Sequence, residues 1–251
     1  MNYYRKKPDA FVSLAHELWP GLQFKPTLTH KFLKVLSDKG LLLRIYSQNI
    51  DGLEFLAGIP EDKLVECHGH FRTASCIDCH RVADPEAVKK TIVEDGKTPL
   101  CNYCGGNVKP DIVFFGEQLP DKFYQLLKKD LPQADLLMIM GTSLNVAPVS
   151  QIPNMVRCNR VLFNRDLVMR IRKGRDSFVE GDCDSNVQKL MDKLNWSVES
   201  QAPEEETEED ETSKEDEKPE ENLDQLFSKI DINDDKKKSA KSSDKKDEKD
   251  K

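Results

Sequence analysis

The sequence predicts an α/β protein with a mainly parallel sheet and a small zinc-binding insertion. Short apolar runs alternate with helical patterns through the first 200 residues, and such alternation is typical of parallel strands covered by helices on both faces. Two Cys-x-x-Cys pairs interrupt the alternation and indicate a metal site. Polar or glycine residues follow the apolar runs, where parallel sheets bind their ligands.

The expected strands are the apolar runs at residues 41–46, 64–67, 112–115, 136–140 and 161–163, and the expected helices lie at 27–39, 122–129 and 186–194. The first helix begins after Thr27, a suitable cap, and stops at Gly40. Ligand chemistry is therefore expected directly after each strand, at 47–51, 68–69, 116–117, 141–143 and 164–166.

Charge divides the chain into two parts. Residues 201–251 hold 20 acidic side chains and 11 lysines, whereas residues 1–200 hold 27 basic and 25 acidic ones. A nearly neutral body lacks the broad basic face of a nucleic-acid-binding protein. The chain also lacks the ~18 consecutive apolar residues of a membrane span. Seven cysteines without a secretion signal indicate a reducing compartment. We therefore expect a soluble cytoplasmic protein that binds neither nucleic acid directly nor membrane.

The tail, residues 197–251, is expected to be disordered because its composition is too charged to bury an apolar core. Within it, residues 221–231 place four apolar side chains at helical spacing. A short helix that docks on a protein partner is one interpretation, and transient structure in a solvated tail is the favoured one. The basic residues 236–238 suggest nuclear entry, but flanking aspartates favour simple solvation.

The cysteine pairs Cys76–Cys79 and Cys101–Cys104 are separated by 21 residues. Each pair presents two thiolates on one knuckle, and two knuckles complete a tetrahedron around Zn²⁺. Four sulfur ligands leave no position for water, so the ion is structural. His80 lies beside Cys79, but four cysteines suffice. Free thiols and a redox pair are the alternatives, and paired motifs fit them poorly.

His68 is the candidate general base. It follows the strand at 64–67 and precedes Gly69, in line with the other polar strand ends. An imidazole is the side chain best suited to accept a proton near neutral pH.

Taken together, the strings SQNID (47–51), ECHG (66–69), the two cysteine pairs, KPDIVFFGE (109–117), GTSL (141–144) and GDCD (181–184) resemble the sirtuin family of NAD-dependent protein deacylases. The resemblance extends from residue 1 to about residue 196, and the motif sequences are most similar to those of the eukaryotic sirtuin-2 and sirtuin-3 branch. It implies a catalytic domain over 1–196, with a Rossmann-like sheet and a zinc ribbon inserted at about 70–110.

The resemblance also implies the chemistry. NAD presents C1′ of its nicotinamide ribose to the oxygen of an acetyl-lysine, nicotinamide leaves, and His68 acts as base on the ribose hydroxyls. The acetyl group ends on ADP-ribose. The substrates are acetylated proteins, such as histones or tubulin.

By the same resemblance, the cofactor contacts are Gln48, Asn49, Ile50, Asp51, Gly141, Thr142, Ser143, Asn164, Arg165, Asp166 and Cys183. The acyl-lysine channel is lined by Val113, Phe114 and Phe115, and Gly116 and Glu117 pair with the substrate backbone. Without the resemblance, we would interpret residues 113–115 as sheet core and Cys183 as an ordinary loop thiol.

Three family features are missing from the sequence. Family members begin with a strand, a Gly-Ala-Gly loop that cradles pyrophosphate at a helix N-terminus, and an Asp-Phe-Arg segment. None of these occurs here, so we expect an N-terminally truncated sheet. Two hypotheses follow: a short form, or a reading frame begun at an internal Met, of an active deacetylase, and a catalytically silent zinc-containing interaction module.

Overall fold

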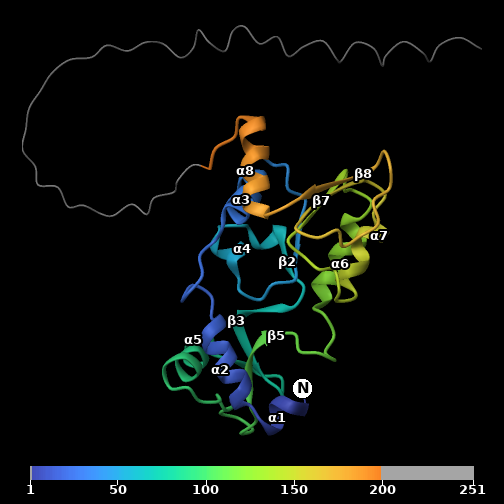
Figure 1. Ribbon diagram of the computed structural model, residues 1–251. Coiled ribbons are helices and arrows are strands. Elements are labelled where there is room, and N and C mark those ends of the chain that lie inside the picture. The colour runs from blue at the N-terminus through green and yellow to red at the C-terminus, as the bar shows by residue number, and fades with distance from the viewer. Residues whose placement is uncertain (1, 199–251) are drawn as a thin grey trace, which may run out of the picture. The chain divides into compact units, whose positions relative to one another are not determined.

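The computed structural model describes residues 2–198 (Figure 1). The chain divides into two units, residues 1–200 and 201–251. The predicted tail helix at 221–231 lies outside the described residues. None of the helices between residues 2 and 198 combines the length and apolar character that crossing a bilayer requires.

Parallel pairing is confirmed, in two separate sheets. β1 (Ile45–Ser47) pairs with β2 (Leu64–Glu66), and the other sheet has the order β6 (Leu136–Met140), β7 (Asn159–Asn164), β8 (Asp176–Glu180). β8 was not predicted, because its sequence DSFVE is half polar. It pairs only with β7 and forms the edge of its sheet.

Helices cover both faces of β6, as the α/β pattern predicts. Alternate side chains of a strand point to opposite faces. Leu137 packs with α6 (Asp121–Asp130), η3 (Val149–Gln151) and α7 (Ile152–Met155). Met138 and Met140 pack instead with α3 (Leu28–Asp38) and α8 (Cys183–Leu194). Between β1 and β2 lie α4 (Leu53–Leu56) and η1 (Glu61–Lys63).

The start of α3 is capped by a hydrogen bond within the helix and by one from α8, which is distant in the sequence. The predicted cap, Thr27, donates its N–H to His30 Nδ1 (3.2 Å). Asp184 of α8 accepts from the N–H of Thr29 (2.8 Å), which satisfies another of the free donors at the helix start. Contact between α3 and α8 is thus polar at one end and apolar along its length.

Two predicted strands are wrong in extent. The run at 41–46 forms a strand only from Ile45, because the N–H groups of Leu41 and Leu42 both bond to the carbonyl of Leu36 and close α3. The run at 112–115 contributes only Ile112, the last residue of β5 (Val108–Ile112). β5 is antiparallel to its neighbour and belongs to another sheet. The rule that ligands bind at the ends of parallel strands therefore gives no reason to expect a site at residues 116–117.

That third sheet belongs to the cysteine-bearing segment and has the order β4 (Val82–Ala83), β3 (Gly69–Cys76), β5. Pro110 is tolerated because β5 is an edge strand. α5 (Pro85–Lys89) and the π-helix η2 (Lys90–Glu94) follow β4. The sheet carries the zinc ribbon expected at about 70–110.

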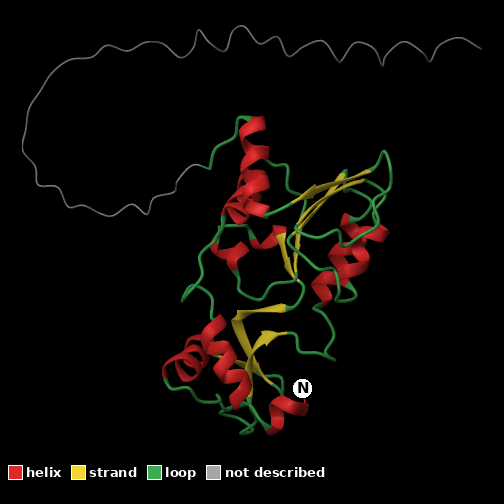
Figure 2. Ribbon diagram, viewed as in Figure 1, coloured by secondary structure: helices red, strands yellow, loops and turns green. Residues whose placement is uncertain are grey.

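The N-terminal helices α1 (Asn2–Lys6) and α2 (Asp9–Leu18) pack against the ribbon, as Figure 2 shows in red beside the yellow strands. The Tyr4 hydroxyl donates to the carbonyl of Val108 (2.8 Å). Val12, Ala15 and Trp19 are buried against ribbon side chains. The ribbon therefore shares its core with the start of the chain, which its cysteine spacing alone could not indicate.

Candidate functional site

Three strand ends are hydrogen-bonded to one another at the carboxyl edge of the parallel sheets. Gln48, after β1, donates from Nε2 to Thr142 Oγ1, after β6 (3.0 Å). Asn164, the last residue of β7, donates from Nδ2 to the carbonyl of Thr142 (3.1 Å). Residues separated by more than 100 positions in the chain thus form one polar surface, which lies where parallel sheets bind ligands.

His68 lies beside this surface with its ring held in one orientation. Its Nδ1 is 2.8 Å from the carbonyl oxygen of Gln48. A carbonyl can only accept, so Nδ1 carries the proton and, in the neutral ring, Nε2 carries the lone pair. Nε2 is buried and has no hydrogen-bond partner among the described residues. The arrangement therefore leaves the lone pair of Nε2 without a partner among the described residues, on the side of the ring away from Gln48.

Two cysteines close to these polar strand ends are unsuited to nucleophilic catalysis. Burial raises the pKa of the Cys67 thiol to about 12, so this neighbour of His68 stays protonated at neutral pH. Burial also raises the pKa of the Cys183 thiol, which lies 3.4 Å from the carbonyl oxygen of Phe163. His68, and not either thiol, is therefore the candidate base among these neighbours.

The remaining predicted cofactor residues occupy the same strand ends with different exposure. Asp51 Oδ1 accepts from the N–H of Leu53 (3.1 Å) at the start of α4. Ile50 packs against the ribbon core. The Arg165 side chain is 81% exposed and pairs with Asp182 (3.5 Å). Exposed positions are held by Asn49, Gly141, Ser143 and Asp166.

The segment 113–117 begins beside His68, and its two phenylalanine side chains point in different directions. The Val113 N–H donates to the carbonyl of His68 (2.8 Å). Phe114 packs edge-on against Phe11 with ring centroids 5.2 Å apart, whereas Phe115 is 94% exposed. The approach of β3 to β5 requires glycine at position 69, because a Cβ there would lie 2.0 Å from the Asp111 carbonyl oxygen.

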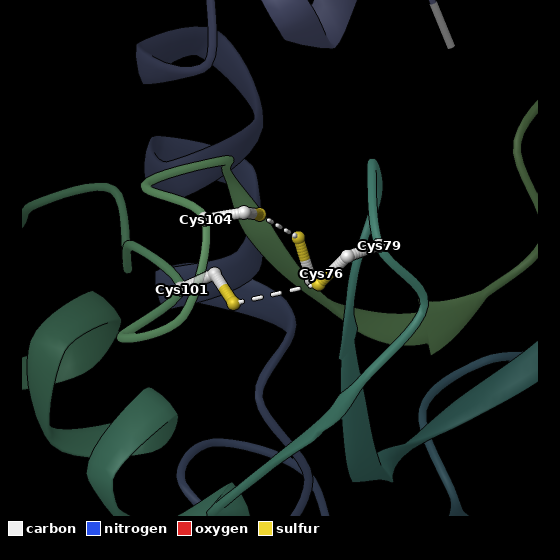
Figure 3. A group of neighbouring side chains, drawn as sticks. All are labelled: Cys76, Cys79, Cys101 and Cys104. Carbon is white, nitrogen blue, oxygen red and sulfur yellow. Dashed lines mark hydrogen bonds between the residues drawn. The ribbon is translucent and has the colours of Figure 1, made fainter.

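The four predicted zinc ligands converge (Figure 3). The sulfurs of Cys76 and Cys104 are 3.5 Å apart, those of Cys79 and Cys101 are 3.7 Å apart, and all four lie within 4.8 Å of one another. A tetrahedral zinc with bonds of about 2.3 Å to sulfur separates its ligands by about 3.8 Å. The cluster therefore fits one structural zinc ion.

The two knuckles have the same backbone design. In the first, the His80 N–H donates to the carbonyl of Cys76 (3.1 Å), and in the second, the Gly105 N–H donates to the carbonyl of Cys101 (2.9 Å). Both donors have a left-handed backbone, with φ of 57° and 72°. His80 thus supplies a turn position, and the ligand cluster consists of cysteines. Backbone N–H groups of Cys104 and Tyr103 lower the pKa of the Cys101 thiol to about 7.

Comparison with known proteins identifies the family. The model of the Sir2 family matches residues 1–148. The chain belongs to the Sir2 family. It is 44% identical over 202 residues to the NAD-dependent protein deacetylase hst2 of Schizosaccharomyces pombe, covering 79% of this chain and 60% of the relative.

Two vertebrate sirtuins are similar to the same degree. Identity is 46% over 204 residues to mouse NAD-dependent protein deacetylase sirtuin-3, covering 79% of this chain and 60% of the relative. It is 42% over 221 residues to zebrafish NAD-dependent protein deacetylase sirtuin-2, covering 79% and 58%. The chain thus spans about 60% of the length of these relatives.

Sequence reasoning missed the burial of several charged residues in this Sir2-family chain, among them Lys109 and Glu54. Lys109 is 8% exposed, although it lies in the recognised string at 109–117. Glu54 in α4 is 5% exposed, and its Oε2 has no hydrogen-bond partner among the described residues. A Lys or Glu is normally exposed, so nothing in the sequence alone marks either side chain as buried.

Proposed function

We propose that this chain is an NAD-dependent protein-lysine deacetylase that transfers the acetyl group of acetyl-lysine to ADP-ribose and releases nicotinamide. The observation that carries the proposal is the orientation of His68, whose buried Nε2 has no hydrogen-bond partner within residues 2–198 and lies beside three connected strand ends. A binding site for a ribose hydroxyl needs such an acceptor within ~3 Å.

The residues at the strand ends fit a dinucleotide in kind and place. NAD would supply an activated ribose carbon that an amide oxygen can attack. Gln48, Asn49, Ile50 and Asp51 would hold its nicotinamide side. Thr142 and Ser143, with Gly141, would lie along the phosphates and the adenosine ribose. Asn164, Arg165 and Asp166 would bind that ribose, and Cys183 would contact the adenine.

The chain's own groups then perform proton handling and substrate placement. The Gln48 carbonyl keeps the His68 proton on Nδ1, so that Nε2 can take a proton from a hydroxyl. The resulting imidazolium would still donate to that carbonyl. Val113, Phe114 and Phe115 would flank the acyl-lysine, and Gly116 and Glu117 would pair with its backbone as an added strand.

The substrates that we propose are acetylated proteins, with histones and tubulin as examples by family resemblance. The proposed domain extends over residues 1–196, and residues 197–251 are proposed as a tail that can bind a protein partner. The proposed location is the cytoplasm, with access to the nucleus. A catalytically silent interaction module is not favoured, because the deacetylase relatives match through most of the described residues.

The test is mass spectrometry of an acetyl-lysine peptide incubated with the purified 251-residue chain, with and without NAD. We expect acetyl loss only with NAD, accompanied by nicotinamide and acetylated ADP-ribose. The variant His68→Ala should reduce the rate by about 10²–10⁴-fold, the usual value of a general base. The matched control is His16→Ala, a helical histidine outside the site. NAD-independent acetyl loss, or full activity of His68→Ala, would refute the mechanism.

A further inference from the structure

Residues 114–117 form a tight turn that is bonded to itself twice. The Glu117 N–H donates to the carbonyl of Phe114 (2.9 Å), and the Phe114 N–H donates to Glu117 Oε2 (2.7 Å). Gly116 has a φ of 89°, which suits the third position of a type II turn. The Glu117 carboxylate therefore fixes the same turn through side chain and backbone together.

Lys109 forms an ion pair with this carboxylate. Its side chain is 9% exposed, and Nζ lies 2.6 Å from the Ile112 carbonyl oxygen, 3.4 Å from that of Pro110 and 3.5 Å from Glu117 Oε2. An ammonium group has three N–H donors, so each has an acceptor nearby. Burying a charge without a partner is costly, and Glu117 is the only carboxylate paired with Lys109 among residues 2–198.

The pair is connected on both sides to the proposed reaction site. Lys109 Nζ lies 4.8 Å from the centre of the Phe114 ring, which packs on Tyr4 and Phe11. On the other side, Val113 is bonded to the carbonyl of His68. With Phe114 held inward, Phe115 is directed outward at the tip of the turn, where it is 94% exposed.

We propose that Lys109 and Glu117 are positioning residues, which hold the 113–117 turn beside His68 in the form that receives the acyl-lysine. The inference rests on the proposed function for the role of the turn, while the ion pair itself stands on the contacts. Glu117 is thus occupied by the turn through its side chain and is left with its backbone for the substrate.

The experiment compares wild type with Lys109→Met, which keeps the shape of the side chain and removes its charge, and with Lys109→Arg, which restores the charge. Lys128→Met is the matched control, because Lys128 is an exposed lysine on α6. Two quantities are measured: hydrogen exchange of the Phe114 amide, and kcat and KM for an acetyl-lysine peptide at saturating NAD.

We expect faster exchange at Phe114 and a KM about ten-fold higher in Lys109→Met, with kcat changed less than about three-fold, because a loosened turn loses substrate binding rather than the base. Lys109→Arg should recover part of the affinity, and Lys128→Met should match wild type. Unchanged exchange in a folded Lys109→Met would overturn the pairing. Faster exchange with unchanged KM would overturn its role in substrate placement.

A failure of the proposed function gives a different result. If wild type neither binds nor converts the acetyl-lysine peptide, the turn has no acyl-lysine role and the positioning assignment falls with it. The exchange measurement at Phe114 then still decides whether Lys109 fixes the turn.

Discussion

Thr142 is hydrogen-bonded to three other residues at the proposed site. Its hydroxyl accepts from Gln48 Nε2 (3.0 Å) and from the Leu144 N–H (3.1 Å), and its carbonyl accepts from Asn164 Nδ2 (3.1 Å). The hydroxyl thus fixes a side chain from β1 and the backbone after β6 at once. The sequence places Thr142 at a strand end, but a hydrogen bond to residue 48 depends on how the sheets meet.

The first prediction concerns this hydroxyl. Thr142→Val keeps the shape of the side chain and leaves two donors without their acceptor. We expect the free energy of unfolding to fall by about 0.5–1.5 kcal/mol, the usual net contribution of a hydrogen bond, because both donors are only part-buried. NAD affinity should fall as well, because Gln48 loses its fixed orientation. Urea unfolding and NAD titration measure the two effects, and a variant with wild-type values in both would contradict this role.

Other site residues could be predicted from the sequence, because their sequence motifs are local. The four cysteines were predicted as one zinc cluster, and the structure confirms that they converge, since each knuckle is made within six residues. Lys109 could not be found in this way. Its charge is paired with Glu117 across a turn, and its Nζ lies over the Phe114 ring, which packs on Tyr4 of the N-terminal helix α1.

At the scale of elements, strands were predicted correctly where both faces are covered, because such strands appear in the sequence as continuous runs of apolar residues. β6 matches its predicted range, and α6 differs from its range by one residue at each end. β3 was missed because its alternate positions include the polar residues His70 and Arg72, which are half-buried. β8 was missed because it carries Asp176, whose side chain is fully buried.

Asp176 gives a prediction for the pairing of β7 with β8. The Arg160 guanidinium, bonded to Asp176 through Nε (2.8 Å), holds the pKa of that carboxyl well below its usual range. An unfolded carboxyl titrates near about 3.9. The stabilisation is therefore complete above that pH and is lost as the pH falls toward the lower folded-state pKa.

Asp176→Asn should lower the free energy of unfolding at pH 7 by about 3–5 kcal/mol, because it leaves Arg160 buried without its counter-charge. The difference from wild type should narrow as the pH falls below about 4. Urea unfolding across this range is the measurement. Asp38→Asn, at a largely exposed pair with Lys34, is the control, and an equal loss in both variants would contradict the argument.

The ribbon gives a prediction of its own. The chain should bind one zinc ion, and Cys76→Ser should lose zinc and expose the shared core, in which Trp19 packs on Phe71 at 5.0 Å. Metal content and tryptophan emission measure both effects. Cys158→Ser, outside the cluster, should retain zinc. Zinc retained at full occupancy by Cys76→Ser would contradict the four-cysteine site.

At the scale of the molecule, the α/β class and the inserted ribbon were predictable, because they follow from alternating patterns and cysteine spacing. The division into two parallel sheets and the shared core of ribbon and N-terminal helices were not. Both depend on which elements meet in space. The proposed cofactor site depends on the same arrangement, because its residues lie at the carboxyl ends of β1, β6 and β7 and at the start of α8.

The most direct test of this account is calorimetric titration of NAD into the zinc-loaded 251-residue chain, beside Asn164→Ala at the end of β7. We predict saturable binding of one NAD per chain, weakened in the variant, because Asn164 holds the carbonyl of Thr142 from the neighbouring strand. No binding by a folded, zinc-loaded chain, or binding that Asn164→Ala leaves unchanged, would contradict a cofactor site built from these strand ends.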